Sequence, residues 1–125
     1  MKMIYIAGKY TDARGEWYQH LNIELAKRVA RHFWKKGDYA VICPHANSAF
    51  MGDSSPSNWE MWLEGDLEMI KRCDMIVMLP NYKDSAGALK ELAFAQSYNI
   101  DITYVEEYAH NTLAWNDGFT MEIIE

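Results

Sequence analysis

The chain has few of the features that mark membrane, secreted or nucleic-acid-binding proteins. Its 125 residues include two cysteines, three prolines, and 12 Lys and Arg against 18 Asp and Glu, which gives a formal charge of −6. Surfaces that hold nucleic-acid polymers need clustered Lys and Arg to displace counterions, so this balance argues against such a partner. A small ligand can still meet local positive charge.

Long apolar runs are also absent. The N-terminus, MKMIYIAGKYTDARG, is apolar only briefly, and no segment approaches the roughly 20 residues of a membrane span. Cys43 and Cys73 stand in apolar surroundings, which favours reduced core residues over a catalytic thiol or a disulfide. We therefore expect a soluble, unexported, cytoplasmic protein with no membrane partner.

Metal and dinucleotide motifs are missing as well. His45 has no second His or Cys at ligand spacing, and the segment Gly8-Lys9-Tyr10 is far from a G-x-G-x-x-G fingerprint. We expect no metal and no redox or dinucleotide cofactor. NAD-like compounds remain open as substrates.

What is present is the composition of a globular protein, with 50% hydrophobic and 24% charged residues. This length suits one domain, residues 1–125, with one core. β-prone runs alternate with amphipathic segments along the chain. The expected strands are Met3–Ala7, Tyr39–Cys43, Asp74–Leu79 and Ile100–Val105, and the expected helices are Glu16–Lys36, Asn58–Arg72 and Ser85–Tyr98.

This alternation predicts a doubly wound α/β fold of the Rossmann-like or flavodoxin-like type, with helices on both faces of a mainly parallel sheet. We expect strand order 2-1-3-4, with four strands, or five if the tail after Glu106 contributes one. Ligands of such sheets bind where the strands end, here at Gly8–Tyr10, Pro44–Asn47 and Pro80–Ser85. The stretch PHANSAFMGDSSPS, Pro44 to Ser57, predicts a long irregular loop at this edge.

One glutamate stands on the apolar face of the last expected helix. Winding Ser85–Asn99 at about 100° per residue places Glu91 inside the apolar arc, while Lys90 falls on the opposite side. The arc consists of Phe94, Gly87, Tyr98, Glu91, Ala95, Ala88, Leu92 and Leu89. A carboxylate facing the core therefore needs an explanation.

The preceding helix repeats this anomaly. Asp66 falls near the middle of an apolar arc, whereas Glu68 and Arg72 lie on the far side, where they can pair. A buried, unpaired carboxylate is strongly unfavourable or has a raised pKa. Each acid alone could simply satisfy a backbone amide or a helix end. Because both helices flank the strand that begins at Asp74, the two acids are expected to converge on one cleft, with Asp74 as a structural cap.

Two carboxylates in different environments can divide the cleavage of a glycosidic bond between a nucleophile and an acid that assists the leaving group. Trp59, Trp62, Tyr5 and Tyr10 would suit stacking on a nucleobase, although the tryptophans also suit a core. The segment Asp84-Ser85-Ala86-Gly87 opens the last helix, and such a helix N-terminus favours a phosphate or a plain N-cap.

Three segments together resemble the nucleoside 2-deoxyribosyltransferase-like superfamily. They are YIAG at Tyr5–Gly8, EGDLEMIKRCDMIVML at Glu64–Leu79 and SAGALKELAFA at Ser85–Ala95. The superfamily includes deoxyribosyltransferases, nucleoside 5′-monophosphate N-glycosidases, and small bacterial and phage proteins that this chain resembles most. The resemblance covers roughly residues 3 to 105.

The resemblance implies a role for each matching residue. Glu91 would be the nucleophile that forms a glycosyl-enzyme at C1′, Asp66 would assist the departing base, and Tyr5 would position the nucleophile or the sugar. Gly8 would bring the first loop close to the ligand. Ser85 and Gly87 would hold a 5′-phosphate. Lys9, His45 and Asn47 are further candidates for substrate binding because they stand where the expected strands end, not because they match a motif of the superfamily.

Free-nucleoside transferases of the superfamily tend to carry aspartate at the position of Ser85, whereas the monophosphate hydrolases carry serine. The leading expectation is therefore an N-glycosidase that hydrolyses a nucleoside or deoxynucleoside 5′-monophosphate or a related nucleotide. The alternatives are a nucleoside 2-deoxyribosyltransferase and a non-catalytic protein that binds a nucleotide metabolite. Ala93 departs from the glycine of many relatives.

Relatives often complete their sites across a subunit interface, so the resemblance also implies a homodimer or a higher homo-oligomer. The completing residue comes from the C-terminal tail in those relatives. Neither Asn111 nor Asn116 is assigned this role from the sequence.

Overall fold

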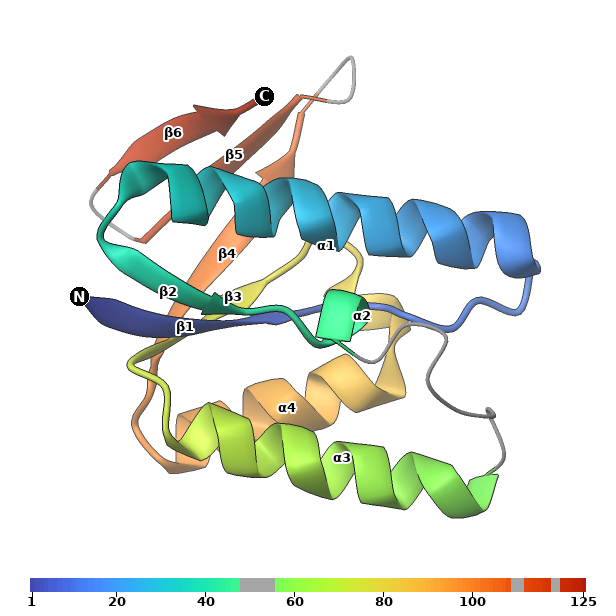
Figure 1. Cartoon of the computed structure of the whole chain (residues 1–125). Helices are drawn as coiled ribbons and strands as arrows, with labels where there is room; N and C mark the ends of the chain where they lie inside the picture. Colours follow the sequence, from blue (N-terminus) through green and yellow to red (C-terminus); the bar gives the residue numbers. More distant parts are fainter. Residues whose placement is uncertain (48–55, 109–111, 118–119) are drawn as a thin grey trace.

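The computed structural model describes residues 1–47, 56–108, 112–117 and 120–125, and its centre is a six-stranded sheet in the order β2-β1-β3-β4-β5-β6 (Figure 1). The strands are β1 (Lys2–Ala7), β2 (Tyr39–Ile42), β3 (Met75–Met78), β4 (Asp101–Glu107), β5 (Leu113–Asn116) and β6 (Met121–Ile124). The helices are α1 (Glu16–Lys36), α2 (Pro44–Asn47), α3 (Pro56–Lys71), the 3-10 helix η1 (Tyr82–Asp84) and α4 (Ala86–Ser97).

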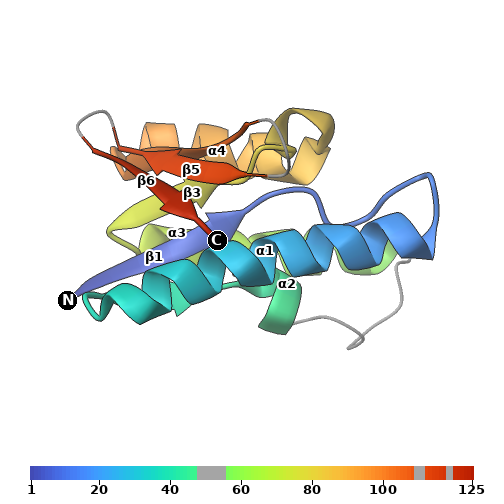
Figure 2. The same ribbon diagram turned by 90° about the horizontal axis from the view of Figure 1, so that it is seen from above.

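Helices cover both faces of the sheet. Figures 1 and 2 show α1 on one face and α3 with α4 on the other. Successive residues of β1 point to opposite faces, as the strand period requires. Ile4 and Ile6 join the core under α1, whereas Tyr5 and Ala7 join the core under α3 and α4. The expected doubly wound α/β architecture is confirmed.

The parallel part of the sheet has the predicted order. β1 pairs in parallel with β2 and with β3, and β3 pairs in parallel with β4. Asp74 ties the start of β3 to β1, because its side chain accepts a hydrogen bond from the Met3 N–H at 2.8 Å and its own N–H donates to the Met3 carbonyl at 2.8 Å. Its predicted structural role is therefore confirmed.

Helix α1 has the bounds that the sequence predicts. It buries one apolar stripe that includes Ile23, Ala26, Val29 and Phe33, which is the pattern of an amphipathic helix on a sheet. It stops at Gly37, whose φ of 84° is readily adopted by glycine and whose N–H bonds the Trp34 carbonyl.

The prediction of four or five strands is wrong, because the tail supplies two. β5 and β6 extend the sheet as antiparallel strands beyond β4. Each has only four residues, too few for a clear alternating pattern. Tertiary contacts stabilise them: Trp115 and Ile124 are buried in the core under α1, and Lys36 on α1 reaches both oxygens of Glu122 at 2.7 Å.

The predicted irregular loop from Pro44 to Ser57 is wrong at both ends. Pro44–Asn47 form the short helix α2, and α3 already begins at Pro56. Proline is well suited to the first turn of a helix, where its missing N–H has no partner to lose. Residues 48–55 lie outside the described part of the chain.

Cys43 and Cys73 are free and buried, as predicted. Cys43 belongs to the core under α1, and Cys73 belongs to the core under α3 and α4. Burial raises the pKa of both thiols, that of Cys73 to about 11 with a contribution from Asp74. In the part of the chain that the structure describes, no helix has both the length and the apolar character needed to cross a membrane.

Candidate active site

A buried hydrogen bond joins two residues that are far apart in the sequence. The hydroxyl of Tyr5 on β1 donates to Oε2 of Glu91 on α4. Tyr5 is fully buried, and Glu91 is only 7% exposed. The alternation of β1 directs Tyr5 toward α4, and the 3.6-residue period of α4 directs Glu91 back toward the sheet with Ala88, Leu92 and Ala95. The helical period of the sequence therefore predicts the buried position of Glu91 correctly.

The predicted apolar arc also includes two residues that are not buried. Leu89 is 43% exposed and Tyr98 is 50% exposed. Leu89 stands at the edge of the arc, and Tyr98 follows the last residue of α4, Ser97, so the helical period no longer places it.

Asp66 lies on α3 beside this pair. It is partly buried and close enough for its charge to act on both Glu91 and Tyr5. The two predicted carboxylates therefore lie close enough to interact, and both of them interact with the hydroxyl of Tyr5.

Burial shifts the pKa values of both acids upward. Desolvation raises the pKa of Glu91 to about 8, with the Tyr5 hydrogen bond opposing and the charge of Asp66 adding to the increase. Desolvation raises the pKa of Asp66 to about 6, again opposed by Tyr5. The charge of Asp66 disfavours the ionisation of Glu91, so the pair holds one proton near neutral pH, and the higher pKa of Glu91 places this proton mainly on Glu91.

The first residues of α4 precede Glu91 on the same helix. Ser85 is the N-cap, and its Oγ accepts a hydrogen bond from the Ala88 N–H at 3.1 Å. The hydroxyl hydrogen is still available to donate. Among the residues that the structure describes, an added Cβ at Gly87 would come near only Ser85 Oγ, at 3.9 Å, so these residues leave the backbone there accessible.

The first loop is held against the end of β3. An added Cβ at Gly8 would lie 2.6 Å from a methyl group of Leu79 and 2.9 Å from Oδ1 of Asn81. Glycine is therefore required by the close approach of two chain segments, whatever its contact with a ligand. The adjacent Lys9 N–H donates to the same Asn81 oxygen at 3.0 Å.

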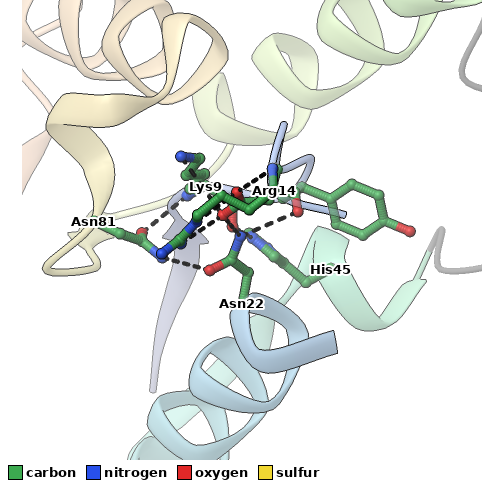
Figure 3. Close-up of polar contacts among 7 residues, drawn as sticks. Lys9, Arg14, Asn22, His45 and Asn81 are labelled. Atoms are coloured by element: carbon green, nitrogen blue, oxygen red, sulfur yellow. Dashed lines mark hydrogen bonds and ion pairs between the residues drawn. The ribbon is translucent and has the colours of Figure 1, made fainter. Parts of the chain in front are cut away.

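A polar network that includes Lys9, Arg14, Asn22 and Asn81 organises this loop (Figure 3). Asp12 accepts hydrogen bonds from Arg14 through Nε at 2.9 Å, Nη2 at 2.8 Å and the backbone N–H at 3.1 Å. Asn22 on α1 adds a contact of 3.4 Å, and Lys9 Nζ lies 3.6 Å away. Asn81 Nδ2 in turn bonds Asn22 Oδ1 at 3.3 Å.

Sequence reasoning misses Asp12, Arg14, Asn22 and Asn81. Three of them lie on loops, where no periodic pattern marks a buried polar side chain. Asp12 does carry a local signal, because an Asp in a loop often accepts a hydrogen bond from the backbone N–H two residues further along, which forms an Asx turn.

A family model described as "Domain of unknown function (DUF4406)" matches residues 2–104, from β1 into β4. The chain belongs to this family. Within the DUF4406 match lie all the candidate residues described so far, whereas β5 and β6 lie beyond it.

Solved structures share the fold of this DUF4406 protein. A 2-deoxyribosyltransferase from Bacillus psychrosaccharolyticus is 22% identical, with a TM-score of 0.56, and the match covers 80% of this chain and 69% of that one. A 2-desoxiribosyltransferase from Leishmania mexicana is 20% identical, with a TM-score of 0.60 and coverages of 86% and 66%. A conserved protein from Enterococcus faecalis V583 is 21% identical, with a TM-score of 0.53 and coverages of 82% and 61%.

These similarities confirm the resemblance to the deoxyribosyltransferase superfamily at the level of the fold. The DUF4406 chain spans about two thirds of the length of each of these proteins. No curated protein matches the chain at a significant level.

His45 of the DUF4406 chain supports the first loop. It is 5% exposed, and its Nε2 lies 2.9 Å from the Lys9 carbonyl oxygen. Burial lowers the pKa of His45, so the neutral ring donates through Nε2. Its ring also packs edge-on against Tyr10 at 5.6 Å between centroids. Asn47 ends α2, and its side chain lies outside the described part of the structure.

The remaining candidates are only partly placed. Trp62 on α3 is partly buried, and the side chain of Trp59 is not among those described. Asn111 also lies outside the described residues. Asn116 ends β5 opposite Tyr104 of β4.

Proposed function

We propose that this protein is an enzyme of nucleoside metabolism that transfers a glycosyl group through Glu91. The observation that carries the proposal is the buried constellation of Glu91, Tyr5 and Asp66, which comes from three different elements. A plain structural carboxylate would be satisfied by a backbone amide or a helix end. Here a tyrosine and a second acid approach it instead.

The chemistry follows from these groups. The Glu91 carboxylate attacks C1′ of the donor while the C1′–N bond breaks, and the base leaves with the bonding electrons and takes a proton from Asp66. The result is a glycosyl ester of Glu91. A nitrogen of a second base, or water, then attacks C1′, gives its proton to Asp66 and frees Glu91. The pair starts and ends each cycle with one proton. Because the pKa of Glu91 is the higher of the two, the reacting form is the one in which this proton has passed from Glu91 to Asp66.

Transfer to a second base is the better-supported outcome. Two of the three solved proteins that share this fold are 2-deoxyribosyltransferases. Hydrolysis of a nucleoside 5′-monophosphate, the leading expectation from the sequence, remains the second candidate. Ser85 favours it, because a hydroxyl beside an open helix N-terminus suits a phosphate better than a carboxylate would.

A base-exchange assay tests the proposal. Wild-type protein is incubated with a panel of nucleosides, deoxynucleosides and their 5′-monophosphates, with and without a second free base, and the products are separated by chromatography. We expect a new nucleoside that appears only with the added base. Base release that does not need the acceptor would identify the hydrolase instead.

Glu91→Gln is the decisive variant, since it keeps the shape of the side chain and removes the nucleophile. Glu68→Gln removes a carboxylate from the exposed Glu68–Arg72 pair on α3 and serves as the matched control. Turnover must vanish in the first variant and persist in the second. Absence of both exchange and release in wild type would refute the proposed activity. The proposed assembly is a homo-oligomer, which sedimentation of the same samples tests.

A further inference from the structure

The loop between β1 and α1 holds a buried charge that the glycosyl chemistry does not use. The side chain of Asp12 is only 1% exposed. A carboxylate so removed from water is unfavourable unless it is paired and hydrogen-bonded. Arg14, Asn22 and Lys9 supply these partners, and the hydrogen bonds from Arg14 hold the pKa of Asp12 well below its usual range. Asp12 therefore stays ionised at physiological pH.

Asp12 holds the side chains of Lys9 and Arg14, and neither cation uses all of its N–H donors on Asp12. Arg14 is 60% exposed and uses its Nε and Nη2 edge for Asp12, so its Nη1 edge points away from this carboxylate. Its guanidinium also packs over the Tyr18 ring at 3.8 Å. Lys9 Nζ is 3.6 Å from Asp12, an ion pair without a short hydrogen bond. Both cationic groups thus have a defined place at the carboxyl edge of the sheet.

The network connects these cations to the segment that leads into α4. Asn81 binds the Lys9 N–H and Asn22, and η1 and the N-cap Ser85 follow directly. The charge of Asp84 acts on Arg14 and raises its pKa further. Arg14 is therefore within electrostatic range of Asp84, the residue before the N-cap of the helix that carries Glu91.

We propose that Asp12 is a positioning residue that holds Lys9 and Arg14 as the cationic pair selecting a glycosyl donor with a 5′-phosphate. The inference rests on the proposed function of Glu91 and adds the substrate class. A phosphate monoester carries a charge of about −1.5 to −2 at neutral pH and three acceptor oxygens, which a guanidinium edge and an ammonium recognise. Because the cations are fixed in advance, less ordering entropy is lost on binding.

The local charge matters because the protein as a whole has a formal charge of −6. An anionic donor is repelled by such a protein unless it meets a positive region. Lys9 and Arg14 are the cationic side chains that this network offers, and Asp12 and Asp84 are the acids that act on Arg14.

The test compares one nucleoside 5′-monophosphate with the free nucleoside of the same base. We expect the ratio of their kcat/KM values to fall about tenfold or more in Asp12→Asn and in Arg14→Gln, through KM of the monophosphate rather than kcat. Glu68→Gln makes the same charge change as Asp12→Asn at a distant exposed pair, and its ratio should match wild type. Arg14 is exposed, so Arg14→Gln keeps the test valid if Asp12→Asn does not fold.

Two results would overturn the inference. One is an unchanged ratio in Arg14→Gln. The other is a higher preference for the monophosphate in Asp12→Asn, which would mean that Asp12 only reduces the positive charge of the loop.

The proposed function can fail separately. If wild type turns over neither compound, calorimetry of the same two ligands decides the matter. A preference for the monophosphate that Arg14→Gln loses supports the cationic pair, and equal or undetectable binding of both ligands overturns it.

Discussion

The hydroxyl of Tyr5 donates a hydrogen bond to the carboxylate of Glu91, a residue 86 positions further along the chain. Both side chains are buried, one in the middle of a parallel strand and the other in the second turn of a helix. The bond fixes the carboxylate and favours its charged form. It therefore gives Tyr5 a measurable effect on the proton equilibrium of the proposed nucleophile.

Replacing Tyr5 with phenylalanine should lower kcat/KM at pH 7 by about 10- to 100-fold, the usual effect of losing a hydrogen bond to a charged group. Because this bond lowers the pKa of Glu91, its removal raises that pKa further. The ratio of variant to wild-type activity should therefore recover as the pH rises from 7 to 9. Tyr104→Phe removes a hydroxyl from the same layer of the core, and an equal loss there would point to packing instead.

Asp66→Asn should change the shape of the pH profile. In wild type the pair loses its protons with pKa values of about 6 and about 8, so kcat/KM is expected to follow a bell with limbs near these values. The variant has no acid to lose on the alkaline side, and its rate should rise to a plateau. Loss of the general acid should also lower kcat by about 10²- to 10⁴-fold. A surviving alkaline limb would remove Asp66 from this role.

Glu91→Gln should stabilise the protein at alkaline pH and not at acid pH. Folding raises the pKa of Glu91 from 4.5 to about 8, so the folded state holds a proton that the unfolded chain releases between these values. The contribution of Glu91 to wild-type stability is therefore fully present below about pH 4.5 and is lost as the pH rises toward 8, by up to about 1.4 kcal/mol for each pKa unit. The side chain of glutamine does not ionise, so Glu91→Gln lacks this loss of stability with rising pH.

Urea unfolding at several pH values between 4 and 8.5 measures this difference. The free energy of unfolding of the variant, minus that of wild type, should increase with pH. In Glu68→Gln the difference should not grow this way, because Arg72 lowers the pKa of Glu68. A gap that is constant with pH would contradict the raised pKa of Glu91.

Two substitutions of Ser85 separate capping from phosphate recognition. Ser85→Ala removes the hydrogen bond to the Ala88 N–H and should destabilise the fold by about 1 kcal/mol. Ser85→Asp keeps an N-cap of similar quality and adds a negative charge. It should remain stable and lose activity on the monophosphate relative to the free nucleoside. Equal effects on the two substrates would argue against a phosphate next to Ser85.

The fold and the reactive pair are largely predictable from the sequence. Glu91 and Asp66 stand out because a helix has a strict period, so a charge on the wrong face is visible without a structure. The strand β3 is the clearest of the parallel strands in the sequence, because all four of its residues are buried and it reads as an apolar run.

The rest depends on contacts between distant segments. Asp12 and Asn81 lie on loops, and only the folded chain brings them to Asn22 on α1. The strands β5 and β6 are short and depend on packing against α1. The sequence predicts that His45 binds substrate because it stands at the end of a strand. In the structure its buried ring instead bonds the backbone carbonyl of Lys9, so position at a strand end alone does not identify a ligand-binding residue.

Each layer of the molecule contains one natural chemical probe. Cys43 lies in the core under α1 and Cys73 in the core under the other two long helices, and both thiols are buried and protonated at neutral pH. A thiol reagent can modify either one only after its layer opens. The labelling rates of the two cysteines therefore report separately on the breathing of the two sides of the sheet, in the unmodified protein and without any added label.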